Sequence, residues 1–145
     1  MNDFLKQYEL YFRAVANANE LNKPVVFDAL AAACLTRVRV EFDGGGDSGQ
    51  IDDITAYTGE VPVELPSTSL TLHQAAQNAG DPTTAKATLR DAIETLCYDY
   101  LSQTHGGWEN NDGAFGSFVF DVAGRTVQLE FNGRFTDVAT HNYDF

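Results

Sequence analysis

Apolar and polar residues alternate in two separate blocks of the chain, and this alternation most constrains the fold. In the first block Val38, Val40 and Phe42 alternate with charged residues, which is typical of a strand with one buried face. Residues 44–50 then supply a glycine-rich turn, and residues 51–57 return as a second strand. The first block therefore predicts a hairpin with a long, glycine-rich tip.

The second block lies near the C-terminus. Phe118, Phe120 and Val122 alternate and are followed by a matching apolar pattern over residues 127–131. Ala123, Gly124 and Arg125 between them predict a tight turn, so this block is a second hairpin. The polar and aromatic tail, residues 135–145, is a candidate for a further edge strand or for a segment packed across the surface.

Helical periodicity occupies most of the remaining chain. Residues 4–21 place their apolar side chains on one helical face, and residues 25–34, after Pro24, predict a second short helix. A further short helix is a candidate at residues 70–78. Asp81 and Pro82 then supply an N-cap and a first-turn proline for the strongest helix, which Gly106 ends. Residues 58–69, with two prolines, predict an irregular connection.

The predicted order is therefore α-α-β-β-(α)-α-β-β. Two hairpins separated by helices favour an α+β fold, in which an antiparallel sheet of about four strands packs against helices. The 145 residues predict a single domain, 1–145, because a chain of this size buries roughly 68% of its unfolded surface without needing a metal or disulfide. Cys34 and Cys97 are predicted to be reduced core cysteines of a cytoplasmic protein, with a disulfide or metal pair as the alternative.

The net charge of −12 is distributed unevenly. Lysine and arginine are missing from residues 40–85 and from residues 91–124, and both stretches contain many aspartates and glutamates. Such a surface repels nucleic-acid phosphates and attracts basic proteins or cations. Direct nucleic-acid binding is therefore not expected, although acidity can also serve solubility alone. No apolar run approaches the roughly 18 residues of a membrane span, so no membrane association is predicted.

Two glycine-rich stretches, residues 41–53 and 105–116, are the candidate functional regions. The first lacks the lysine of a phosphate-binding loop, and a chain of this length is too short for the double barrel of the proteases that its Gly46–Gly49 segment resembles superficially. If the two stretches lie side by side, they form one composite binding site; at opposite ends of the sheet, both reduce to turns. The residues predicted to bind are Asp43, Asp47, Ser48, Gln50, Asp52, Asp53, Trp108, Glu109, Asn110 and Asp112.

These stretches also carry a resemblance to a known family. The motifs GGGDSGQID and HGGWENNDGAFG, the strand at residues 118–122 and the closing segment at residues 132–137 resemble a family of small proteins from bacterial genomes, plasmids and phages. The resemblance covers roughly residues 38–145 and leaves the N-terminal helices outside. The family is a domain of unknown function, so the resemblance implies a cytoplasmic protein of a mobile element and transfers no catalytic residue.

Two classes of function remain from the sequence. The first is a non-enzymatic acidic protein that engages a basic, nucleic-acid-binding surface of a host protein, such as an anti-defence or anti-CRISPR inhibitor that imitates DNA. The second is a small metal-dependent enzyme or cation-binding protein that uses Asp43, Asp47, Asp52 and Asp53, with His105 or His141 as further groups. The first is the prediction, with a protein partner, no cofactor, no metal and no catalytic residue assigned.

Overall fold

In the computed structural model, the described residues are 3–45, 48–74, 83–104, 113–133 and 139–145. Within them the chain forms two helices and eight strands. The helices are α1 (Asp3–Ala32) and α2 (Leu89–Thr104). The strands are β1 (Arg37–Gly45), β2 (Ser48–Thr58), β3 (Val61–Val63), β4 (Ser69–Gln74), β5 (Thr83–Thr88), β6 (Ala114–Asp121), β7 (Thr126–Gly133) and β8 (Ala139–Asp144).

The strands form two antiparallel sheets. The larger has six strands in the order β3-β2-β1-β6-β7-β8, and the smaller is the two-stranded ribbon β4-β5. In the larger sheet β1 joins the β1-β2 hairpin to the β6-β7 hairpin, because β2 pairs with one of its edges and β6 with the other. The mixed helix and strand composition and the antiparallel sheet confirm the predicted class. The predicted four strands are too few.

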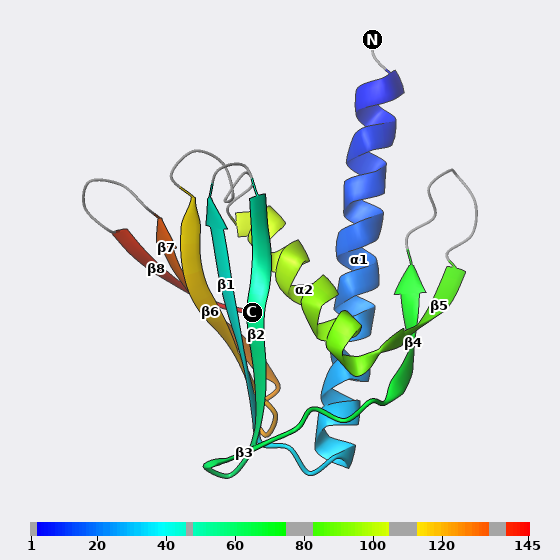
Figure 1. The fold of residues 1–145 in the computed structure, drawn as a ribbon. Coiled ribbons are helices and arrows are strands. Elements are labelled where there is room, and N and C mark those ends of the chain that lie inside the picture. Colours follow the sequence, from blue (N-terminus) through cyan, green and yellow to red (C-terminus); the bar gives the residue numbers. More distant parts are fainter. Residues whose placement is uncertain (1–2, 46–47, 75–82, 105–112, 134–138) are drawn as a thin grey trace.

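The elements stack in layers on one side of the larger sheet (Figure 1). The helix α2 and the C-terminal part of α1 face the sheet, and the β4-β5 ribbon packs on the far side of α1. One cluster of buried apolar side chains joins these layers. Within it Phe27 of α1 contacts Phe120 of β6, with ring centroids 5.9 Å apart, and Phe42 of β1 contacts Phe118 of β6 at 5.6 Å.

The two N-terminal helices of the prediction are one continuous helix. Proline inside a helix removes one backbone hydrogen bond, so Pro24 was expected to begin a new helix. The helix continues because its buried face runs through that point: Asn22, Val26 and Leu30 are spaced by four residues and are all buried, whereas Pro24 is exposed. Packing on the body of the protein thus outweighs the lost hydrogen bond.

The predicted short helix at residues 70–78 is wrong over residues 70–74, and residues 75–78 lie outside the described ones. Residues 69–74 form β4, which pairs with β5 from Ser69↔Thr88 to Gln74↔Thr83. Asn22 of α1 holds this strand: its side-chain amide donates to the carbonyl of His73 at 3.0 Å, and its carbonyl oxygen accepts from the N–H of His73 at 2.7 Å. One buried asparagine therefore attaches the ribbon to the helix.

The helix predicted from Asp81 and Pro82 begins later, at Leu89. Those two residues lie outside the described ones, and residues 83–88 form β5. Thr88 is the observed N-cap, since its hydroxyl oxygen accepts from the N–H of Asp91 at 3.1 Å. Threonines at both ends of this segment favour the strand and explain why the helix starts after them.

The two additional strands lie at the two edges of the larger sheet. The C-terminal tail forms β8, which confirms the predicted edge strand, and the connection predicted as irregular contains the short β3. Pro62 in β3 is compatible with an edge position, where a missing N–H is tolerated. The glycine-rich tip is shorter than predicted, because Gly44, Gly45 and Gly49 are paired within β1 and β2.

The end of α1 explains the position of Cys34, which was predicted to lie in the core. Cys34 is exposed and has a φ of 60°, in the left-handed region. The N–H of Leu35 donates to the carbonyl of Leu30 at 3.1 Å and that of Cys34 to Ala31 at 3.0 Å, the hydrogen bonds of a Schellman motif. Cys34 therefore occupies the position where glycine is favoured. Only Cys97 is buried.

Replacing Cys34 by glycine is expected to stabilise the protein by about 1 kcal/mol, because glycine adopts a positive φ without the steric cost that a Cβ brings. Urea denaturation of Cys34→Gly and of the wild type measures the difference. Cys34→Ala retains the Cβ and serves as the control, with an unfolding free energy close to that of the wild type. Equal stability of the glycine and alanine variants would contradict the assignment.

Candidate functional site

The face of the larger sheet that points away from the helices is open. Figure 1 shows α1, α2 and the β4-β5 ribbon on one side of the sheet only. Along β1 the side chains of Val38, Val40 and Phe42 are buried, whereas those between them are exposed. We call this solvent-facing side the open face. Its charged residues, taken from strand register and exposure, are Arg37, Arg39, Glu41, Asp43, Asp52, Asp53, Asp121, Glu130 and Asp144.

A β-bulge places the acidic residues of β2 on the open face. The β1-β2 register shifts between Glu41 and Phe42, so that Glu41 pairs with Asp53, Phe42 pairs with Ile51, and Asp52 is the extra residue. Ile51 and Ile54 are three residues apart and would otherwise point to opposite faces, but the extra residue lets both pack on the core side. The bulge thus turns Ile51 and Ile54 toward the core and exposes Asp52 and Asp53.

Three carboxylates lie in one line across the sheet. Asp53 pairs with Glu41, Glu41 pairs with Ser117, and Ser117 pairs with Glu130. Neighbouring strands are about 4.8 Å apart. Because Glu41 and Glu130 lie two strands apart, their backbones are separated by about 10 Å. We call Asp53, Glu41 and Glu130 the acidic row.

Two arginines of the described strands, Arg37 and Arg39, lie on the open face, on the side of Glu41 away from Asp43. Arg39 forms an ion pair with Glu41, with Nε and Oε1 3.2 Å apart. Arg37 lies over the ring of Tyr57, with its guanidinium carbon 4.3 Å from the ring centroid. The partly buried Phe115 and Val119 of β6 supply apolar surface between the charged residues. Because Phe115 lies opposite Asp43 and Val119 opposite Arg39, this apolar surface flanks the acidic row on both sides. We call the end of the open face that carries Asp43, Asp52 and the acidic row its acidic end.

The two glycine-rich stretches meet at this acidic end. Gly44 pairs with Gly49 across β1-β2 and with Ala114 across β1-β6. Asp43 likewise pairs with Gln50 on one side and with Phe115 on the other. The last residues of the second stretch, in β6, therefore pair with residues of the first stretch in β1. The two stretches meet at the same end of the sheet.

Four of the predicted binding residues have described side chains on this surface: Asp43, Gln50, Asp52 and Asp53 are all exposed. The amide of Gln50 donates to Oδ1 of Asp52 at 3.1 Å, and the hydroxyl of Thr55 donates to Oδ2 of Asp53 at 2.9 Å. The backbone of Ser48 pairs with Gly45, but its side chain is not among the described ones. The remaining predicted binding residues, Asp47, Trp108, Glu109, Asn110 and Asp112, lie outside the described residues.

Two features of the surface were missed in the sequence. Glu130 alternates with the buried Leu129 and Phe131 and could have been assigned to an exposed face, but its alignment with Glu41 depends on strand register. Tyr98 of α2 was also missed: its hydroxyl oxygen accepts from the N–H of Ile51 at 3.0 Å, next to the bulge. This hydrogen bond joins α2 to the strand that carries Asp52 and Asp53.

The described residues contain no group of three or more His, Cys, Asp or Glu side chains arranged to hold a metal ion. Of the aspartates considered for a cation, Asp43, Asp52 and Asp53 are exposed on the open face, and Asp47 lies outside the described residues. The backbone of His141 lies in β8, and His105 is outside the described residues. Within the described ranges no helix is long and apolar enough to cross a membrane.

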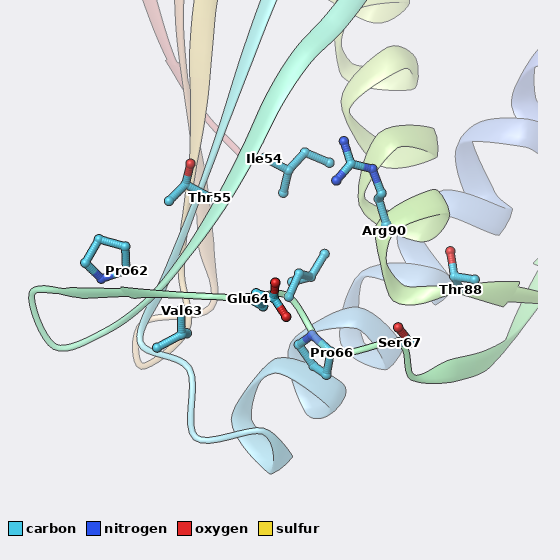
Figure 2. Close-up of a pocket in the computed structure, with 10 residues that line it drawn as sticks. Ile54, Thr55, Pro62, Val63, Glu64, Pro66, Ser67, Thr88 and Arg90 are labelled. Atoms are coloured by element: carbon cyan, nitrogen blue, oxygen red, sulfur yellow. The ribbon is translucent and has the colours of Figure 1, made fainter.

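A groove lies at the other end of the sheet, between the β2-β3 edge and the start of α2. It encloses about 620 Å³ and contains none of the predicted binding residues. Figure 2 shows Ile54 and Arg90 on facing walls, with Val63 and Pro66 below them. The guanidinium of Arg90 forms an ion pair with Glu94, with Nε and Oε1 3.5 Å apart. The groove is thus separate from the acidic row.

Two ionisable groups of α2 lie in the core beneath the sheet. Burial, and to a smaller extent the carboxylate of Glu94, raise the pKa of the Cys97 thiol. Burial also raises the pKa of Tyr100, with smaller contributions from Cys97, Glu20 and Asp99. Both groups are therefore neutral in the folded protein.

These shifts predict that the protein loses stability in alkali. Unfolded cysteine and tyrosine release their protons near pH 8.5 and 10, whereas the folded groups retain them to higher pH. The contribution of these two groups to the free energy of unfolding is expected to be constant below about pH 8.5 and to fall above it, by up to about 1.4 kcal/mol per pH unit for each group. Urea denaturation across this range measures the slope. Tyr100→Phe keeps the ring and should fall less steeply above about pH 10; a slope equal to that of the wild type would contradict the prediction.

The comparisons with known proteins give one match. A family model described as a family of unknown function, DUF6878, matches residues 18–145. The chain belongs to this family. The match starts at residue 18, so the DUF6878 region includes the C-terminal half of α1 and extends further toward the N-terminus than the predicted boundary near Val38. No curated protein and no solved structure matches.

Proposed function

We propose that this DUF6878 protein is a non-enzymatic binding protein that uses the acidic end of its open face to engage a basic surface of another protein. The observation that supports this most is the acidic row, in which Asp53, Glu41 and Glu130 come from three different strands and lie in one line. Their side chains are exposed, and among the described residues no helix covers them. Glu41 forms an ion pair with Arg39, but three carboxylates beside one arginine leave this part of the sheet negative, so a partner of opposite charge is attracted to it.

The chemistry of the surface indicates the class of partner. Rows of carboxylates on a stiff scaffold present negative charges at regular spacing, as a nucleic-acid backbone does. A protein that binds nucleic acids offers the complementary arginines and lysines. We therefore propose that the partner is a nucleic-acid-binding protein, and that this chain is an inhibitor from a bacterial mobile element, of the anti-defence or anti-CRISPR kind. The partly buried Phe115 and Val119 add apolar contact at the centre of the interface.

Capture from a bacterial lysate at low and high salt tests this function. The immobilised protein is expected to retain a basic protein at low salt and to release it at high salt, because complementary charge drives the association. Added duplex DNA is expected to displace the partner, since both compete for the same basic surface. The triple variant Glu41→Gln, Asp53→Asn, Glu130→Gln should lose the partner.

The matched control is the triple variant Glu20→Gln, Glu60→Gln, Glu64→Gln, which removes the same charge from exposed residues that are not on the acidic row. It is expected to retain the partner. Equal capture by both triple variants would refute the assigned surface. A partner that DNA does not displace would refute the nucleic-acid-binding class, and direct binding of DNA by the protein itself would contradict the proposal as a whole.

A further inference from the structure

The strand β8 forms one edge of the larger sheet and offers unpaired backbone groups there. The N–H of Phe145 donates to the carbonyl of Val127 at 2.8 Å, so this pair is hydrogen-bonded. In an antiparallel ladder, hydrogen-bonded and non-hydrogen-bonded pairs alternate. The pairs of Asp144, Asn142 and Thr140 with β7 are therefore of the second kind, and their N–H and C=O groups point away from β7. Among the described residues no strand pairs with this edge.

The opposite edge is protected and β8 is not. Natural sheets shield their edges with short strands, prolines, lysines or bulges. At the opposite edge β3 has three residues, of which Pro62 is the middle one. By contrast, β8 has six residues, contains no proline or lysine, and pairs with β7 without a shift of register. An edge of this kind is suited to pairing with another strand.

The sequence of β8 is compatible with a second copy of itself. In a two-fold antiparallel pair centred on Asn142, Thr140 of one copy lies opposite Asp144 of the other, and Asn142 lies opposite Asn142. Each copy then donates from three N–H groups, which accounts for every outward backbone donor of the strand. Asp144 is the only aspartate or glutamate of β8, so no two carboxylates face each other directly even though each chain carries a charge of −12.

We propose that two copies of this chain pair through β8 and join their six-stranded sheets into one continuous sheet. A second copy fits this edge because the pairing gives hydrogen-bond partners to the outward N–H and C=O groups of β8 in both copies. The pairing also places a strand of the second copy beside Tyr143, which is partly buried and packs against the core. The pairing uses backbone groups at the edge of the sheet and not the carboxylates of the acidic row, although Asn142 at its centre lies opposite Glu130 in the β7-β8 pair. A six-residue ladder is a small interface, so we expect a dissociation constant in about the micromolar range.

Sedimentation velocity over a range of concentrations tests this pairing. The wild type is expected to shift from the 15.9 kDa monomer toward twice that mass as its concentration rises. Asn142→Pro removes an outward N–H that the monomer does not use, so it should fold normally and remain monomeric. Asn142→Thr at the same position keeps the N–H and should still dimerise.

Circular dichroism and thermal melting establish that each variant is folded. If Asn142→Pro does not fold, Asn142→Lys replaces it, because a lysine at this edge opposes its own copy across the two-fold axis and should also prevent pairing. A wild type that remains monomeric at its highest soluble concentration would overturn the proposal. A folded proline or lysine variant that dimerises like the wild type would overturn it as well, since the dimer would then use another surface.

Discussion

Replacing Phe118 by alanine is expected to cost about 3–5 kcal/mol of unfolding free energy, a large part of the stability of a domain of this size. Phe118 is fully buried and lies where the sheet meets α2: its ring centroid is 5.6 Å from that of Phe42 and 6.2 Å from that of Tyr100. Truncation removes this apolar contact and leaves a cavity that the rigid sheet fills poorly. Urea denaturation followed by circular dichroism measures the loss.

The control for this substitution is Val119→Ala, at the next residue of the same strand. Val119 is partly buried and faces the opposite side of the sheet, so its truncation should cost less than about 1 kcal/mol. If Phe118→Ala and Val119→Ala cost the same, the assignment of the two faces of the sheet is wrong.

The second large effect is expected for Gly116→Ala. A Cβ at Gly116 would lie 2.0 Å from the backbone carbonyl oxygen of Glu130 and 2.9 Å from the tip of the Phe42 ring. The carbonyl belongs to the neighbouring strand β7, so one of the two strands must move. We expect a loss of about 3 kcal/mol, at the upper end of the cost of overpacking. The loss is measured by urea denaturation.

Gly124→Ala is the matched control. A Cβ there would lie 3.3 Å from the carboxylate of Asp121 and 3.8 Å from the hydroxyl of Thr126, and both are exposed side chains that can shift slightly. The alanine variant should therefore remain within about 0.5 kcal/mol of the wild type. A stable Gly116→Ala protein would contradict the close approach of β6 and β7. Gly116 is the last residue of the second glycine-rich stretch. The close approach of β7 explains why this position is a glycine.

Local patterns were sufficient to predict the two hairpins that flank the centre of the larger sheet. The alternation in β1 and around residues 123–125 depends only on neighbouring residues, and the structure confirms both hairpins. The pairing of β1 with β6 joins residues that are about 80 positions apart, from Arg37↔Asp121 to Gly44↔Ala114. No local pattern indicates this pairing, and the antiparallel class alone permits other strand orders.

The errors in the prediction have physical causes that lie outside the local sequence. Pro24 normally favours a break, but burial of the helix face on both sides of it keeps α1 continuous. Leu70 and Leu72 are compatible with a helix or a strand, and the tie between Asn22 and His73 belongs to the strand. In both cases contacts between distant residues override a weak local preference.

The candidate surface was predictable in composition but not in geometry. Asp43, Gln50, Asp52 and Asp53 are polar or charged residues that flank the glycines, which is why they are predicted to bind, and all four are exposed at one end of the sheet. Glu41 and Glu130 were not assigned, since their alignment with Asp53 follows from the bulge at Asp52 and from strand register. The acidic row is thus a product of tertiary structure.

The affinity of the captured partner for the acidic row is the most direct test of the proposed function. Isothermal titration calorimetry at low and high salt compares the wild type with the two triple variants. The variant Glu41→Gln, Asp53→Asn, Glu130→Gln is expected to bind about tenfold more weakly or worse and to show a smaller salt dependence, since about 1.4 kcal/mol corresponds to a tenfold change. The variant Glu20→Gln, Glu60→Gln, Glu64→Gln should bind within about twofold of the wild type. Equal affinities for the two triple variants would contradict binding through the acidic row.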